Sequence, residues 1–166
     1  DCSWYLPEAG KHALDDFRRS HIPGARFIDL GVVSDPDSPY VNMLPSADLW
    51  SREVGRLGID NDTTVIVYDA GYVSARLWWM FRVFGHEKVR ILDGGFRKWV
   101  AEGRPTEEGD AAPVEAKPFR AELQPGKVAT LDDVRAALEN NATVVDARTA
   151  ARFDGTEGSG YPGVAS

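Results

Sequence analysis

The chain has 166 residues, a formal net charge of −7, and 43% hydrophobic and 27% charged residues. The acidic balance argues against a surface for nucleic acids or anionic membranes, and no apolar run has the length of a membrane span. The single cysteine, Cys2, excludes an internal disulfide framework, and the three distant histidines offer no zinc-ligand spacing. We therefore expect a cytoplasmic globular protein with no metal and no cofactor.

The first part of the chain predicts short elements separated by turns. Residues 1–4 have the pattern of the tail of a strand, and residues 13–19 have helical spacing with a basic end, the charge preferred at a helix C-terminus. Pro23 and Gly24 predict a turn into a short buried strand over residues 25–30.

A loop rich in Pro, Asp and Ser is predicted over residues 31–45. Ser46 then has the position of an N-cap for a helix that runs to about Leu57, with Gly58 as its stop.

Residues 63–85 are the stretch around which the rest of the prediction is organised. The run TVIVYD is β-branched and continuously apolar, which predicts a strand buried on both faces. A loop over residues 69–75 then leads to a helix over residues 76–85. In an α/β protein this junction is where ligands and chemistry usually lie. We expect the aromatic side chains of the helix to pack in the core and between domains: Trp78, Trp79, Phe81 and Phe84.

The second half of the chain predicts one more strand and helix, and then a change of composition. Residues 89–92 form the strand, and residues 96–103 form the helix after an Asp-Gly-Gly turn. Residues 105–127 carry several prolines and few large apolar residues, which is typical of a linker.

After the linker, Thr130 has the position of an N-cap for a helix, with two aspartates in its first turn. Residues 143–147 predict a strand, and the rest of the chain to residue 166 predicts a loop.

Strands that alternate with helices predict an α/β fold with a central, mostly parallel sheet and helices on both faces, in three layers. The sequences DCSW at residue 1 and DARTAARF at residue 146 form a faint internal repeat. We therefore predict a first domain over residues 1–104, a linker over 105–127, and the truncated start of a second similar domain over 128–166. Both ends look cut, so we expect the chain to be a segment of a longer protein.

Several motifs resemble the rhodanese family of sulfurtransferases in its tandem two-domain form. The motif F-x-x-x-HIPGA from Phe17, with WWMFRVFGH and LDGGFRKW, is similar to the first, non-catalytic domain. The motifs VVDAR and RFDGTE are similar to the opening of the catalytic second domain. The resemblance implies a rhodanese-like fold and transfer of a sulfane sulfur from an anionic donor, thiosulfate or 3-mercaptopyruvate, to a thiophilic acceptor such as cyanide or a thiol. It also implies a second rhodanese domain of the same chain as partner.

The family's chemistry requires a loop cysteine that becomes a persulfide, and this chain has none at a strand–helix junction. Asp69 stands at the matching place, where a carboxylate can cap the loop but cannot carry sulfur. We therefore expect no catalytic residue in this segment, and interpret Asp69 and Arg76 as a vestigial loop. The resemblance assigns contact with the anionic donor to Arg152.

The remaining chemical side chains are interpreted as structural. His21, before a Pro-Gly turn, and Cys2 are expected to pack or to make hydrogen bonds, and Asp146 and Arg148 are expected to fix the end of the second domain's first strand. Mercaptopyruvate enzymes of the family place a second arginine nine residues beyond the first, where this chain has Tyr161, unless residues are missing from this loop. We therefore expect the complete enzyme to prefer thiosulfate.

Two functions remain open, a sulfurtransferase and a catalytically inactive rhodanese-like module with a binding or regulatory role. A cysteine loop after Ser166 would favour the first. A dinucleotide-binding domain is disfavoured because no G-x-G-x-x-G follows a strand, and a phosphatase would need the same missing cysteine.

Overall fold

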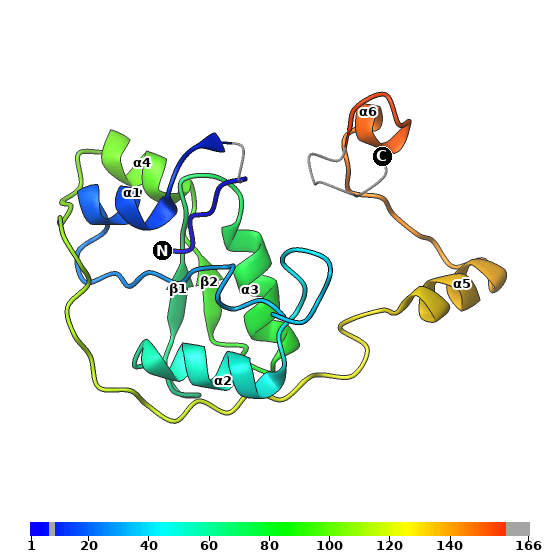
Figure 1. Ribbon diagram of the computed structural model, residues 1–166, viewed down its shortest axis with the longest axis horizontal. Coiled ribbons are helices and arrows are strands. Elements are labelled where there is room, and N and C mark those ends of the chain that lie inside the picture. The colour runs from blue at the N-terminus through cyan, green and yellow to red at the C-terminus, as the bar shows by residue number, and fades with distance from the viewer. Residues whose placement is uncertain (7–8, 159–166) are drawn as a thin grey trace. The chain divides into compact units, whose positions relative to one another are not determined.

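The computed structural model describes residues 1–6 and 9–158, and the chain divides into two compact units, Asp1–Pro125 (unit 1) and Gly126–Ser166 (unit 2) (Figure 1). Unit 1 holds α1 (Ala13–Arg19), α2 (Ala47–Arg56), β1 (Val65–Val67), α3 (Ser74–Val83), β2 (Val89–Ile91) and α4 (Gly95–Ala101). Unit 2 holds α5 (Leu131–Glu139) and α6 (Ala150–Phe153).

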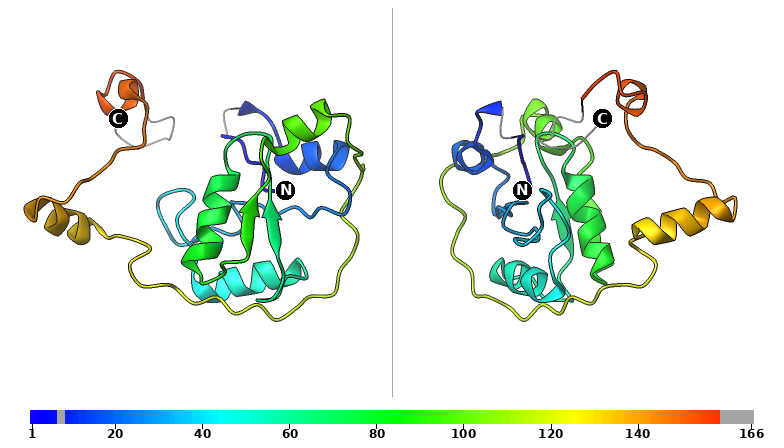
Figure 2. Two further views of the ribbon diagram at one scale, coloured as in Figure 1. Left: turned by 180° about the vertical axis from the view of Figure 1, so that it is seen from behind. Right: turned by 45° about the vertical axis from the view of Figure 1, so that its right-hand side comes forward.

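A small parallel sheet lies at the centre of unit 1. Strands β1 and β2 pair in the register Val65↔Val89 to Val67↔Ile91, and α3 packs against them (Figure 2). Side chains alternate between the faces of a strand, and Val65 and Val67 are buried while Ile66 is 53% exposed. The prediction that this strand is buried on both faces is therefore wrong, because no described element covers Ile66.

The core of unit 1 forms where α2 meets α3. Trp50 is fully buried, with its ring 5.0 Å from Phe81 in an edge-on contact and 5.5 Å from Phe84 in a stacked one. Aromatic pairs in such geometries stabilise a core beyond their buried area. The predicted core role of Phe81 and Phe84 is confirmed, whereas Trp78 and Trp79 are only partly buried beside this cluster.

Residues 105–125, which we call the strap, lie on unit 1 as an extended segment (Figure 1). Phe119 is buried in the core cluster. Lys117 N–H donates to the carbonyl of Gly55 at 2.9 Å, and Gln124 N–H donates to that of Val83 at 2.8 Å. The segment predicted as a linker therefore contributes to the packing of the first unit.

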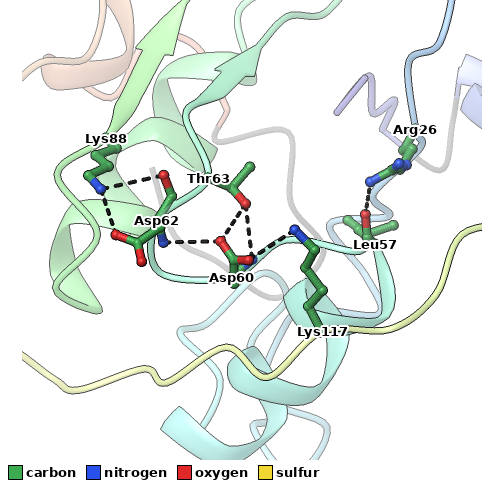
Figure 3. Close-up of polar contacts among 7 residues, drawn as sticks. All are labelled: Arg26, Leu57, Asp60, Asp62, Thr63, Lys88 and Lys117. Carbon is green, nitrogen blue, oxygen red and sulfur yellow. Dashed lines mark hydrogen bonds and ion pairs between the residues drawn. The ribbon is translucent and has the colours of Figure 1, made fainter.

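Charged contacts fix the turn that precedes β1 (Figure 3). Asp60 accepts hydrogen bonds from the Thr63 hydroxyl at 2.7 Å and from Lys117 Nζ of the strap at 2.9 Å. These partners hold the pKa of the Asp60 carboxyl well below its usual range, the Thr63 bond first and the Lys117 bond second. Lys88 also pairs with Asp62 at 2.9 Å, so the strap and the start of β2 are both tied to this turn.

Two of the predicted strands in unit 1 are wrong. Residues 1–4 and 25–30 are not strands in the structure. The two segments nevertheless touch, because Ile28 N–H donates to the carbonyl of Asp1 at 2.9 Å and the α-amino group of Asp1 donates to that of Arg26 at 2.6 Å. A strand needs a continuous ladder of such bonds, and here the ladder covers a single residue.

In unit 2 the predicted helix is confirmed and the predicted strand is wrong. Thr130 and Asp133 form a capping box at the start of α5, with Thr130 Oγ1 accepting from Asp133 N–H at 3.2 Å. Residues 143–147 are exposed and form no strand, since no described segment of unit 2 supplies a partner. The predicted loop after residue 147 contains a short helix, α6, which Thr149 caps. None of the helices in the described residues is long and apolar enough to span a membrane.

Candidate functional site

The loop between β1 and α3 is built around the side chain of Asp69. This carboxylate is only 3% exposed, and its Oδ2 accepts the N–H of Ser74, the first residue of α3, at 2.8 Å. Its Oδ1 accepts the N–H of Gly71 at 3.1 Å. The carboxylate therefore occupies the point on which the loop's N–H groups converge, as expected for a residue that caps the loop and the helix behind it.

The main chain around Asp69 is also held by neighbouring segments. Its carbonyl accepts the N–H of Phe96 in α4 at 2.9 Å, and the Ser3 hydroxyl accepts the N–H of Ala70 at 3.2 Å. Gly95 has φ +56°, and a Cβ there would lie 2.6 Å from the Asp69 carbonyl oxygen. Only glycine fits this close approach, so the turn before α4 depends on it.

Arg76 lies in the first turn of α3, and its guanidinium has no carboxylate partner among the described residues. Its Nη2 donates to the carbonyl of Asn42 at 2.7 Å, and the group stacks on the ring of Trp79 at 4.6 Å. Its Nε is buried without a hydrogen-bond partner, and burial lowers the pKa of this guanidinium. Asp69 and Arg76 thus share one helix start, but no ion pair or hydrogen bond joins these two described residues. Their origin as a vestigial loop stays a prediction.

In unit 2, the arginines of the motifs VVDAR and RFDGTE each form an ion pair with a nearby residue of the same segment. Arg152 lies in α6, with Nε 3.3 Å from Oε1 of Glu157. Arg148 binds Asp146 at 2.8 Å, and this arginine holds the pKa of the Asp146 carboxyl below its ordinary value. Tyr161, the residue from which donor preference was predicted, lies outside the described residues.

Cys2 has the environment of a structural thiol. It is 1% exposed, and its Sγ donates to the carbonyl of Tyr68 at 3.3 Å. Burial raises the pKa of the thiol to about 12. Since the thiolate is the nucleophilic form, burial and the raised pKa both disfavour reaction at this side chain.

His21 is equally buried, but it has a carboxylate neighbour that the sequence did not indicate. Its Nδ1 lies 2.8 Å from the carbonyl of Phe17, whose ring stacks on the imidazole at 4.0 Å. Its Nε2 lies 3.8 Å from Oε2 of Glu107 in the strap. No local sequence signal could have predicted that His21 contacts Glu107, because the two residues are distant in the chain. An isolated antiparallel bridge between their main chains brings them together.

Comparison with known proteins gives matches over most of the chain. A family profile described as "Rhodanese-like domain" matches residues 12–102. Human 3-mercaptopyruvate sulfurtransferase is 45% identical over 162 residues, covering 95% of this chain and 54% of that protein. Chicken thiosulfate sulfurtransferase is 44% identical, covering 95% and 55%. The chain therefore spans about half the length of the curated relatives it matches, and corresponds to their N-terminal half.

Solved structures match as well. SseA from Escherichia coli, described as a 3-mercaptopyruvate sulfotransferase with the "Rhodanese" fold, superposes with a TM-score of 0.86 at 38% identity, over 92% of this chain and 60% of its own. Tum1 protein from Saccharomyces cerevisiae superposes with a TM-score of 0.88 at 25% identity, over 100% of this chain and 59% of its own.

Proposed function

Because the chain belongs to the rhodanese-like domain family, we propose that it is the N-terminal part of a sulfurtransferase that moves a sulfane sulfur from thiosulfate or 3-mercaptopyruvate to a thiophilic acceptor such as cyanide or a thiol. The observation that carries the proposal is identity of 44% to 45% with named sulfurtransferases along 95% of the chain. The fold of the chain is the rhodanese fold, as the superposition on SseA shows.

The sulfur carrier of this proposal is a cysteine beyond Ser166. Two features of unit 1 support that placement. Cys2 is a buried thiol whose pKa is raised to about 12, and Asp69 already fills the N–H cradle at the strand–helix junction. In the proposed cycle with thiosulfate, a thiolate attacks the outer sulfur of the donor, the S–S bond of thiosulfate breaks, and sulfite leaves with the bonding electron pair. The acceptor then takes the outer sulfur from the persulfide, and the cysteine returns to the thiolate.

The proposal extends to the architecture of the complete protein. Residues 1–104 form a first rhodanese domain with a wider parallel sheet and helices on both faces, and residues from 128 onward begin a second, catalytic one. The division of the chain after Pro125 supports a second domain that begins near residue 128. A cytoplasmic location is part of the same proposal, since a free buried thiol is compatible with a reducing compartment.

Arg152 is the residue of this chain that we assign to the sulfur donor. A guanidinium suits a compact anion, and the side chain of Arg152 is 39% exposed with one weak ion pair at 3.3 Å, so it can exchange Glu157 for a donor. We further propose that the complete enzyme prefers thiosulfate, because Tyr161 brings no positive charge for the carboxylate of mercaptopyruvate.

Steady-state kinetics of the complete protein with both donors tests these assignments. Arg152→Ala is expected to lower kcat/KM by an amount that corresponds to a loss of about 1.5–3 kcal/mol of transition-state stabilisation. Arg135→Ala, which removes an exposed ion pair of α5, is the matched control and leaves kcat/KM unchanged. Unchanged kcat/KM in Arg152→Ala would refute the role of Arg152, and a higher kcat/KM for mercaptopyruvate in the wild type would refute the preference.

A binding or regulatory module without catalysis is the second candidate, and the filled cradle at Asp69 is the observation that favours it. An assay of thiocyanate formation by the complete protein, with cyanide as acceptor, distinguishes the two candidates. Turnover that survives Cys2→Ser supports the enzyme, whereas no turnover with either donor supports the module.

A further inference from the structure

The part of the strap nearest to unit 2 is bound to the C-terminal end of α3. Glu122 N–H donates to the carbonyl of Phe84 at 3.2 Å, and Gln124 N–H donates to that of Val83 at 2.8 Å. The last carbonyls of an α-helix have no donor within the helix, so the strap supplies donors that α3 lacks. We call residues 119–124, which include these two donors, the anchor segment.

His86 lies between α3 and the anchor segment. Its N–H donates to the carbonyl of Phe81 at 2.8 Å, directly after Gly85 turns the chain out of α3 with φ +84°. In such a Schellman end the residue at the position of His86 is commonly apolar and packs on the helix. Here the side chain is an imidazole that is only 2% exposed, with its ring 5.4 Å from that of Phe81 and 5.5 Å from that of Phe119.

The imidazole of His86 lacks a partner for a positive charge. Its Nε2 is buried without a hydrogen-bond partner in the described part of the chain. α3 and the anchor segment present aromatic rings to it. The charged groups of the adjoining segments are already paired with one another (the first two pairs in Figure 3): Asp60 with Lys117, Lys88 with Asp62, and Arg82 with Glu87.

Protonation of His86 therefore opposes the packing beneath the anchor segment. Burial, the largest influence, lowers the pKa of this imidazole below its ordinary value of 6.5. Main-chain groups of Thr63 and Lys88 and the charge of Asp60 act in the opposite direction, but the pKa of His86 stays lowered. Neutral His86 thus stabilises the packed state above about pH 6.5, and this contribution is lost as pH falls toward the folded-state pKa.

The other end of the strap covers a second buried histidine, which has different surroundings. His21 Nε2 lies 3.8 Å from Oε2 of Glu107, and the main chains of these two residues exchange both hydrogen bonds at 2.9 Å. A positive charge on His21 gains a carboxylate of the strap, whereas a charge on His86 is buried without one. Acid should therefore favour contact at the Glu107 end of the strap and oppose it at the anchor segment.

We propose that the anchor segment is a pH-dependent latch. When His86 takes up a proton, residues 119–124 leave α3, whereas the strap around Glu107 stays bound. Because unit 2 begins at Gly126, release of the anchor segment lengthens the free linker between the two units by up to about 20 Å. The latch acts on the connection between the units and does not depend on sulfur transfer.

Amide hydrogen exchange of the complete protein, followed residue by residue by NMR at pH 7.5 and pH 5.0, tests the latch. Protection factors, which remove the intrinsic pH dependence of exchange, are compared with those of Glu107 and Gly109 as internal references. At pH 5.0 they are expected to fall at Glu122 and Gln124 by at least about threefold relative to the references. The upper limit is about 30-fold, because pH 5.0 lies about 1.5 pH units below the ordinary histidine pKa of 6.5. A smaller relative fall would overturn the proposal.

Variants at His86 identify the group that titrates. His86→Phe keeps an aromatic ring beneath the anchor segment but takes up no proton, so the relative protection at Glu122 and Gln124 is expected to lose its pH dependence. His86→Gln provides a second neutral side chain of a different shape. His12→Gln, which removes an exposed histidine before α1, is the control and keeps the wild-type response. A pH response that persists in both His86 variants would assign it to another group and overturn the latch.

Discussion

Units 1 and 2 differ in what holds their elements in place. Every buried side chain of the described residues belongs to unit 1, where Trp50, Leu77, Met80 and Val54 are completely buried. In unit 2 most of the large apolar side chains are exposed, with Leu138 at 57% and Val145 at 81%. The helices of unit 2 are stabilised by local hydrogen bonds such as the Thr130 cap, and the strand predicted for this unit does not form. Local bonds are thus enough for a short helix, but a strand needs a neighbour and a core needs distant segments.

The largest difference between the units is expected from truncation of an apolar side chain. Trp50→Ala removes the fully buried ring between Phe81 and Phe84, and should lower the free energy of unfolding by about 3–5 kcal/mol. Leu138→Ala, in unit 2, should change it by less than about 0.5 kcal/mol. Urea titrations followed by far-UV circular dichroism measure both. Equal losses would contradict the contrast between the units.

A glycine contact tests whether the strap belongs to the core of unit 1. A Cβ on Gly55 would lie 2.4 Å from the carbonyl oxygen of Lys117, so Gly55→Ala must displace the strap. We expect a net loss of about 1–3 kcal/mol, although alanine alone would favour α2. Gly71→Ala, which adds a Cβ in open space, is the control for the measurement by urea denaturation. A gain in stability for Gly55→Ala would show that the strap is only loosely held.

The loop of Asp69 offers a smaller effect that is local but buried. Asp69→Ala leaves the N–H groups of Ser74 and Gly71 without their acceptor, which should cost about 1–2 kcal/mol. Asp93→Ala, which removes only an exposed ion pair with Lys98, is the matched control. Denaturation midpoints that agree within error for Asp69→Ala and the wild type would contradict the capping role.

The smallest effect is expected at the turn before β1 and depends on pH. Because the pKa of Asp60 in the folded state lies below the ordinary value of 3.8, the carboxylate adds stability above that value and loses it as pH falls toward the folded-state pKa. Asp60→Asn should therefore be less stable than the wild type at pH 7, with a difference that shrinks below about pH 4. Asp37→Asn, in an exposed loop, is the control. Thermal unfolding across pH 2–7 measures the difference in stability between Asp60→Asn and the wild type. A difference that does not change with pH would contradict the role of the Asp60 carboxylate.

The sequence predicted well those elements whose signals are local. The helices α1 and α2 begin and end close to the predicted residues, and α5 begins at its predicted cap, since Ser46 and Thr130 supply the caps and basic residues end α1. The position of Asp69 at the end of a strand likewise predicted its bonds to the loop. Each of these features depends on residues within a few positions of one another.

The sequence could not predict features that depend on distant partners. The extended segments over residues 25–30 and 143–147 carry strand-like side chains but lack a neighbour to complete a ladder. The contact of His21 with Glu107 and the burial of Phe119 arise from the path of the strap, whose composition indicated only a linker. The donor assignment to Arg152 rests on the resemblance and stays a prediction.

The central claim is that this chain supports sulfur transfer without carrying the sulfur. The most direct test treats the complete protein with thiosulfate and locates the added sulfur by peptide mass mapping. The account predicts the mass of one added sulfur atom on a cysteine beyond Ser166, and an unmodified Cys2, whose buried thiol has its pKa raised to about 12. Sulfur on Cys2, or on no cysteine at all while the protein forms thiocyanate, would contradict it.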